Sequence, residues 1–141
     1  MAVTATPVFV QNPKITPAAF TNADSANTKK TIASAGSNGS KVVSINVSST
    51  ETANARVLQI WLTRSATSYL LASFSIIVNS GFDGIVPSVS MMASHIWSSL
   101  PVDSDGQTYL FLESGDTLQA STTTQVAAGK EIDVVAIFGN F

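Results

Sequence analysis

The sequence predicts an all-β protein, an antiparallel β-sandwich or jelly roll of seven to eight strands that follows an extended N-terminal arm. After residue 28, short segments alternate apolar with polar residues, and turn-forming residues separate them. This is the pattern of half-buried strands. No stretch repeats its apolar residues at the spacing of an amphipathic helix. Packing two sheets face to face is then the simplest way to bury the apolar sides of the strands.

The N-terminal segment differs from the rest of the chain. Residues 1–27 hold three of the five prolines, Pro7, Pro13 and Pro17. Proline has no backbone N–H and a fixed φ, so this composition disfavours both helix and sheet pairing. We therefore expect an extended arm over residues 1–27 and a single sandwich domain over residues 28–141.

The first predicted strands form a hairpin. Residues 31–34 and 41–48 flank a turn that contains Asn38-Gly39, a pair that readily adopts the positive φ of tight hairpin turns. The second of these strands alternates cleanly, and its apolar face is predicted to hold Val43, Ile45 and Val47.

The next predicted strand, residues 56–63, carries a tryptophan on its second face. Leu58, Ile60 and Leu62 share one side of this strand, and Trp61 lies on the other. A tryptophan there either seals a second layer or marks a contact surface, because tryptophan is enriched in interfaces.

The second half of the chain predicts a long strand, a long crossover and three shorter strands. The long strand spans residues 69–78, and residues 85–100 form the crossover, with one helical turn near residues 91–97. Both faces of the last strand are apolar, so we expect it to be central and covered on both sides. The three shorter strands are predicted at residues 108–113, 117–121 and 131–138.

The chain is unusually poor in charge. Only 11% of its residues are charged, against about 25% in typical soluble domains, and it contains 20 Ser and 15 Thr. Charged groups are costly to desolvate, whereas a hydroxyl group can satisfy its hydrogen bonds within a contact. Such a surface suits permanent association with other protein.

Charge and hydropathy also argue against two classes of partner. The net charge is −2 and the seven Lys and Arg are scattered, so no basic footprint for nucleic acid is present. No apolar run approaches the length of about 20 residues that a membrane helix needs, and the first residues lack the pattern of a signal peptide. We expect no nucleic-acid partner, no membrane partner and synthesis in the cytoplasm.

The inventory of reactive groups is thin, and we expect neither an enzyme nor a cofactor or metal site. The chain has one histidine, His95, and no cysteine, and no nucleophile-elbow motif accompanies the histidine. The sequences 103–106 and 113–116 each combine acidic residues with a glycine, which turns explain more simply than a calcium loop or a catalytic carboxylate pair. Five aromatic residues could form a sugar platform, although packing is the simpler role: Phe82, Trp97, Tyr109, Phe111 and Phe141.

Several segments together resemble small virion proteins of tailed bacteriophages. They are the polar arm around residues 13–30, the turn and strand 35–45, the strand 57–62, and the ending formed by residues 112–121 and 134–141. Within that group the sequence is most similar to the capsid decoration, or cement, proteins. The resemblance implies a compact sandwich on the outside of the phage head, with the major capsid protein and a second copy of the chain as partners, the latter in a homodimer or homotrimer. It implies no catalytic residues.

A receptor-binding or carbohydrate-binding module of a phage tail is the alternative, because tail tips also use small β-sandwiches. On either hypothesis the arm, the outward tryptophan and the crossover are the expected contact regions. The candidate partner contacts are Pro7, Pro13, Pro17, Phe20, Trp61, Met91, Met92 and Trp97.

Overall fold

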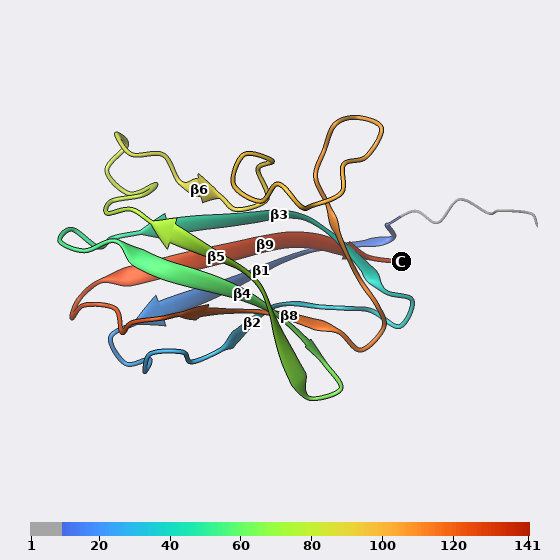
Figure 1. The fold of residues 1–141 in the computed structure, drawn as a ribbon, viewed down its shortest axis with the longest axis horizontal. Helices are drawn as coiled ribbons and strands as arrows, with labels where there is room; N and C mark the ends of the chain where they lie inside the picture. Colours follow the sequence, from blue (N-terminus) through green and yellow to red (C-terminus); the bar gives the residue numbers. More distant parts are fainter. Residues whose placement is uncertain (1–9) are drawn as a thin grey trace, which may run out of the picture.

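The computed structural model describes residues 10–141 and confirms the predicted β-sandwich (Figure 1). Nine strands and no helix make up this part of the chain, and all strand pairs are antiparallel. The strands are β1 (Asn12–Thr21), β2 (Lys30–Ser34), β3 (Ser40–Ser49), β4 (Arg56–Arg64), β5 (Thr67–Ile76), β6 (Val89–Ser90), β7 (Leu110–Leu112), β8 (Thr117–Thr122) and β9 (Glu131–Asn140).

The strands form two sheets that pack face to face. The first, sheet A, has the order β1-β9-β3-β6, and β7 also pairs with β3. The second, sheet B, has the order β2-β8-β4-β5. The last strand of the chain, β9, is therefore central in sheet A, as its apolar sequence predicted.

The core lies between the two sheets and is made by alternate residues of the long strands. Sheet B contributes Leu58, Ile60, Leu118 and Ala120, all fully buried. The interruption of the β3–β9 register between Val42 and Ser44 turns Val42 into the core and leaves Val43 exposed, so the prediction that Val43 faces inward is wrong. Sheet A contributes Val42, Ile45, Val47, Ile132, Val134, Ala136 and Phe138.

The predicted hairpin between residues 31 and 48 does not form. The turn is present, with the Gly39 N–H donating to the Gly36 carbonyl at 3.0 Å, but β2 pairs with β8 in sheet B and β3 lies in sheet A. Both Ile32 and Ala33 are buried. A local turn signal reverses the chain, but it does not decide which strand becomes the hydrogen-bonding neighbour.

Residues 12–21 belong to the sandwich and do not form part of a separate arm. They make up β1, which pairs with β9 over ten positions, and Phe20 is fully buried in the core. The Thr50 N–H donates to the Glu131 carbonyl, so the backbone groups of Glu131 point toward β3. Backbone groups alternate in direction along a strand. Odd-numbered residues of β9 therefore bond to β3, and even-numbered residues bond to β1. This register turns the nitrogens of Pro13 and Pro17 toward the open edge, where a missing N–H costs nothing.

The crossover after β5 closes one side of the sandwich. Met91, Met92, Trp97 and Leu100 are all buried, and the ring centroids of Phe74 and Trp97 lie 5.7 Å apart. The Ala93 carbonyl accepts hydrogen bonds from the N–H groups of residues 96 and 97, each at 2.9 Å, so a single helical turn forms where it was predicted. Its apolar side chains serve the core of this chain.

Candidate interaction surfaces

The outer face of sheet A carries an uncovered apolar strip. We define the β1–β9 strip as Ile15, Pro17, Val135 and Ile137, which pair across the two strands as Ile15 with Ile137 and Pro17 with Val135. Ile15 is 68% exposed and Ile137 is 39% exposed. The prediction that β9 is covered on both faces is therefore wrong for this chain alone, because its second face is open to solvent.

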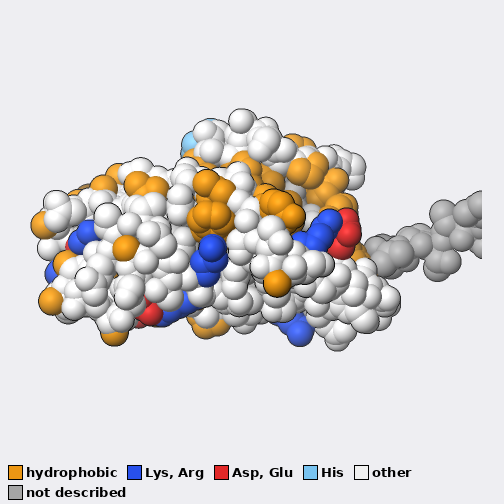
Figure 2. Space-filling model, turned by 60° about the horizontal axis from the view of Figure 1, so that its bottom comes forward, with side chains coloured by type: hydrophobic (Ala, Val, Ile, Leu, Met, Phe, Trp, Pro, Cys, Tyr) orange, Lys and Arg blue, Asp and Glu red, His pale blue; other side chains and the backbone are white. Residues whose placement is uncertain are grey.

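Uncharged polar residues flank the strip on one side and two acidic residues lie at its end. Ser44 and Asn46 of β3 continue the rows that contain Ile137 and Val135. Glu131 and Asp133 lie at the other end of β9, and their hydrogen bond and mutual repulsion raise the pKa of Glu131. Figure 2 shows another consequence of the composition, since charged side chains are few on the face it draws and most of that surface is uncharged.

Trp61 lies on the outer face of sheet B, where its ring is only half-exposed. Its indole Nε1–H donates to Ser121 Oγ at 2.9 Å, and Lys29 Nζ lies 4.4 Å from the ring centroid. Leu70 is its exposed cross-strand neighbour on β5. Trp61 thus packs partly against its own sheet and keeps one side accessible, so its role as a partner contact stays a prediction.

A row of hydrogen bonds crosses sheet B beside Trp61. Thr63 Oγ1 lies 2.9 Å from Ser68 Oγ and donates to Gln119 Oε1 at 2.7 Å, and Gln119 Nε2 donates to Thr31 Oγ1 at 3.4 Å. The row links β5, β4, β8 and β2. Hydroxyl and amide groups of this outer face are therefore satisfied by one another, which lowers the cost of removing water from them.

Three aromatic residues meet at one end of the sandwich. The ring centroids of Tyr109 and Phe111 are 4.8 Å apart, those of Phe111 and Phe141 are 5.9 Å apart, and Lys41 Nζ lies 4.9 Å from the Tyr109 ring. Phe111 and Phe141 line a hollow of about 640 Å³ together with Ser37, Asn38, Gly39, Leu112, Glu113 and Ser114.

The other predicted contact residues are placed less favourably for direct binding. Pro13 and Pro17 are exposed on β1, whereas Phe20, Met91, Met92 and Trp97 are buried in the core. A buried side chain contributes to an interface only by shaping the surface above it. Pro7 lies outside the described residues.

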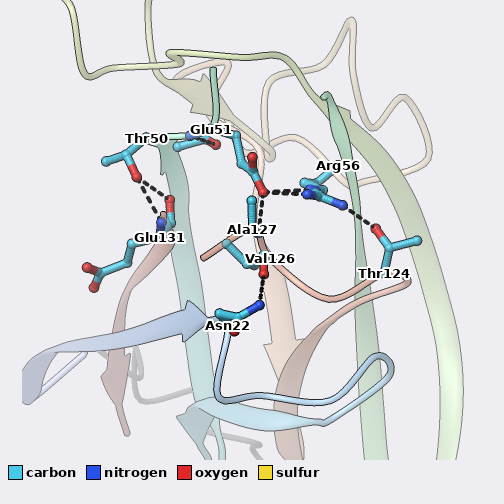
Figure 3. Close-up of polar contacts among 9 residues, drawn as sticks. Asn22, Thr50, Glu51, Arg56, Thr124, Val126, Ala127 and Glu131 are labelled. Atoms are coloured by element: carbon cyan, nitrogen blue, oxygen red, sulfur yellow. Dashed lines mark hydrogen bonds and ion pairs between the residues drawn. The ribbon is translucent and has the colours of Figure 1, made fainter. Parts of the chain in front are cut away.

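Two buried carboxylates are held in structural ion pairs, of which the sequence analysis considered Asp116, within residues 113–116, and missed Glu51. Figure 3 shows Glu51, whose Oε1 accepts bonds from Arg56 Nε at 2.7 Å and from the Ala127 N–H at 2.8 Å. Burial opposes the charge of Glu51, but these bonds outweigh it and lower its pKa. Asp116 is likewise buried, and the guanidinium of Arg64 holds it by two bonds of 2.7 Å and lowers its pKa. Asp116 has both carboxylate oxygens engaged, and Glu51 has its Oε1 engaged by Arg56 and Ala127, so both side chains serve as structural ion pairs.

Both acidic sequences that were predicted as turns form turns. The Gly106 N–H donates to the Asp103 carbonyl, and Asp103 Oδ1 accepts the N–H groups of Asp105 and Gln107 at 3.1 and 2.9 Å. These backbone bonds lower the pKa of Asp103. The Asp116 N–H donates to the Glu113 carbonyl in the second turn.

Other sites considered from the sequence find little support in the described residues. His95 is exposed, and residues 10–141 hold no group of three or more His, Asp or Glu side chains arranged to bind a metal ion. No helix in this same range is long and apolar enough to cross a membrane.

No model of a known protein family matches the sequence, and no curated protein matches it. Among solved structures, the chain is similar to a pentameric capsid protein isolated from metagenomic phage sequences, in two crystal structures. For both structures the sequence identity is 23%, the TM-score is 0.40 and the match covers 91% of this chain. The match covers 62% of the capsid protein chain in one structure and 60% in the other. It is also similar to a chain of the cyanophage Pam1 capsid asymmetric unit, at 16% identity and a TM-score of 0.48, covering 99% of this chain and 94% of that chain. These likenesses concern the fold alone.

Proposed function

We propose that this chain is a non-enzymatic structural protein of a tailed-phage virion, a capsid decoration or cement protein. It is made in the host cytoplasm, binds the outside of the head and clamps neighbouring subunits of the major capsid protein. The resemblance of residues 13–30, 35–45, 57–62, 112–121 and 134–141 to that group gives the proposal its direction.

The observation that carries the proposal is the β1–β9 strip. An apolar sheet face that stays open to water costs free energy, and a protein surface of opposite shape would bury it. Uncharged side chains border the strip on β3, so a partner there does not have to desolvate ions. Many symmetric copies on one shell would add such modest contacts into a large total.

The register of β1 also constrains how the partner binds. Pro13 and Pro17 turn their nitrogens to the open edge of sheet A, so two of the edge positions have no N–H to donate. A strand of the capsid protein cannot form a regular ladder there. The contact is therefore made by side chains on the face of β1 and β9, and not by addition of a strand at their edge.

Binding to purified heads that lack the protein tests the strip directly. The double variant Ile15→Ser, Ile137→Ser changes two exposed residues and should leave the fold intact. Burial of a whole isoleucine is worth about 1.5–3 kcal/mol, so losing two partly exposed ones predicts about 2 kcal/mol, or roughly a 30-fold weaker affinity. Val102→Ser removes an exposed side chain outside the strip and is the matched control. Equal occupancy of heads by wild type and double variant would count against the strip.

The copy number on purified virions separates the head from the tail. A shell-covering protein should be present in hundreds of copies per particle and remain with heads when tails are removed. A few copies that fractionate with the tail would favour the receptor-binding or carbohydrate-binding alternative. Antibody labelling of intact heads then tests whether the protein lies on the exterior.

A further inference from the structure

The hollow at the C-terminal end of the sandwich presents aromatic surface to solvent. Phe111 is 56% exposed, and its ring meets those of Tyr109 and Phe141 at interplanar angles of 57° and 52°. The hollow that Phe111 and Phe141 line measures about 640 Å³, and a cavity of roughly 150 Å³ already holds a benzene molecule. It therefore has room for a phenylalanine ring and a second apolar side chain, and an added ring can extend the row of tilted rings.

The charged groups near the hollow are already paired. Glu113, which lines the hollow, lies 3.3 Å from Arg64, and Arg64 also holds Asp116 by two bonds of 2.7 Å. Lys41, which follows the turn at the hollow, lies 3.5 Å from Asp103. Each of these two basic groups thus has a carboxylate partner. Since the exposed lining is mainly aromatic, the hollow suits an apolar and uncharged segment.

The described part of the chain begins beside this hollow. The Gln11 N–H donates to the carbonyl of Asn140, the residue before Phe141, at 2.9 Å. Val10 lies against Gly139, because a Cβ added to Gly139 would collide with the Val10 side chain. The core residues of β9 are even-numbered, so the missing Cβ of Gly139 would point to the outer face. Val10 therefore lies on the outer face of sheet A.

The register of sheet A leads from Val10 to the hollow. Gly139 pairs with Lys41 of β3, and Lys41 pairs with Phe111 of β7, so Val10 and Phe111 lie over the same row of the sheet. Neighbouring strands are about 4.8 Å apart, which places β7 about 10 Å from β9 along this row. An extended chain covers about 3.3 Å per residue, so about three residues before Val10 are enough to cross from β9 to β7.

The residues that precede Val10 have the chemistry that the hollow requires. They are Pro7, Val8 and Phe9, all apolar and uncharged, and residues 1–9 lie outside the described residues. We propose that Val8 and Phe9 of the same chain fill the hollow, with the Phe9 ring against Phe111. This contact is separate from the proposed attachment to the capsid, which uses the β1–β9 strip.

A tethered segment needs only a small contact to occupy the hollow. A fully buried aromatic side chain contributes about 150–250 Å², whereas stable interfaces between separate proteins bury about 1,200–2,000 Å². A short tether, however, holds the segment at an effective concentration in the millimolar range. The same aromatic contact can therefore form within one chain although it is too small to hold two chains together.

Disulfide trapping within one chain tests the proposal, and the absence of cysteine from the sequence makes the background clean. The double variant Val8→Cys, Ser114→Cys carries one thiol in the segment and one in the lining of the hollow. The matched control is Val8→Cys, Ser34→Cys, since Ser34 is exposed at the end of β2, five residues before Gly39. With oxidised glutathione, the Ser114 pair should form its disulfide at least tenfold faster than the Ser34 pair. The product should be a monomer, formed at a rate that does not change with protein concentration.

The trapping should depend on the aromatic contact. Phe9→Ser or Phe111→Ser, added to the Ser114 pair, should slow trapping to the rate of the control pair. Phe82→Ser removes an exposed phenylalanine from another loop and should leave the rate unchanged. The cysteine-free protein gives a second readout, because chymotrypsin should cleave after Phe9 at least tenfold faster in Phe111→Ser than in wild type.

Either of two results would overturn the proposal. One is an equal trapping rate for the Ser114 and Ser34 pairs, which would mean that the segment has no preference for the hollow. The other is a Ser114 disulfide that forms only between chains, seen when Val8→Cys and Ser114→Cys are mixed as separate proteins, which would assign the hollow to a second copy. These measurements use the free protein without phage heads, so their failure leaves the proposed attachment to the capsid untouched.

Discussion

Replacing Glu51 by alanine tests how far a buried ion pair at the β3–β4 connection stabilises this sandwich. Glu51 is only 1% exposed, and its Oε1 accepts bonds from Arg56 and from the Ala127 N–H. The variant leaves the Arg56 guanidinium without its buried counter-charge and the Ala127 N–H without an acceptor. Because Ala127 lies just before β9, the loss loosens the junction between the two sheets.

The expected loss can be estimated from these contacts. Removing one partner of a buried pair costs about 3–5 kcal/mol. The Arg56 side chain retains 13% exposure and a bond to Thr124 Oγ1 at 3.2 Å, so water and Thr124 compensate it in part. We expect about 3 kcal/mol, which lowers the melting temperature by roughly 10 °C in a chain of this size.

Chemical denaturation at pH 7 measures the loss, with Glu113→Ala as the matched control. Glu113 pairs with Arg64 at 3.3 Å, but its side chain is 76% exposed, so that pair should contribute less than about 1 kcal/mol. A Glu51→Ala loss no larger than the Glu113→Ala loss would refute the assignment of a structural role to the buried pair.

The pH dependence gives a second check on Glu51. Its pKa in the folded state is below the ordinary value of 4.5, so its contribution is present above about pH 4.5 and is lost as the pH falls through the folded pKa. The difference in unfolding free energy between wild type and Glu51→Gln should therefore shrink as the pH falls from 5 toward 3. A difference that stays constant over that range would contradict the lowered pKa.

Three further substitutions test the fold. Phe20→Ala should lower the free energy of unfolding, measured with denaturant, by about 3–5 kcal/mol, because the side chain is fully buried. A loss below about 1 kcal/mol would indicate that residues 12–21 form a separate arm. Ala66→Gly should raise the free energy of unfolding by about 1 kcal/mol, because Ala66 has a φ of 65°, a conformation that is unfavourable for residues other than glycine. An unchanged melting temperature would argue against this positive φ at residue 66. Gly39→Ala should lower the free energy of unfolding more than Gly84→Ala does. Both glycines have a positive φ, but only at residue 39 would the added Cβ approach another atom, Leu112 O at 2.7 Å. Equal losses for the two variants would contradict this steric explanation.

Most strands could be predicted because their signal is local. Alternation over residues 56–63 and 131–138, with turn residues on either side, is enough to place β4 and β9 within a few residues. Strand β1 could not be predicted in this way. Its two prolines argue against pairing in general, and only the register with β9 shows that their nitrogens face the open edge.

The candidate surfaces were harder to predict because exposure depends on the whole fold. The apolar residues of β9 did indicate two buried faces, but the sequence does not say that the second face lacks a cover within the chain. Met91 and Trp97 were expected at a contact, yet the crossover turns them into the space between the sheets. Exposed Phe82 was considered from the sequence only as part of a sugar platform and exposed Ile85 was not considered, although both lie in the turn-rich segment Gly81-Phe82-Asp83-Gly84-Ile85.

The central position of β9 has a consequence for how the protein folds during synthesis. Strand β9 joins β1 to β3, yet it is synthesised after the other eight described strands. Until β9 is synthesised, β1 and β3 lack the strand that links them, so sheet A cannot be completed. Contacts between distant parts of a chain also form slowly. Nascent chains that still lack β9 have unpaired strands, and low temperature or slow expression should improve the yield by limiting encounters between such chains.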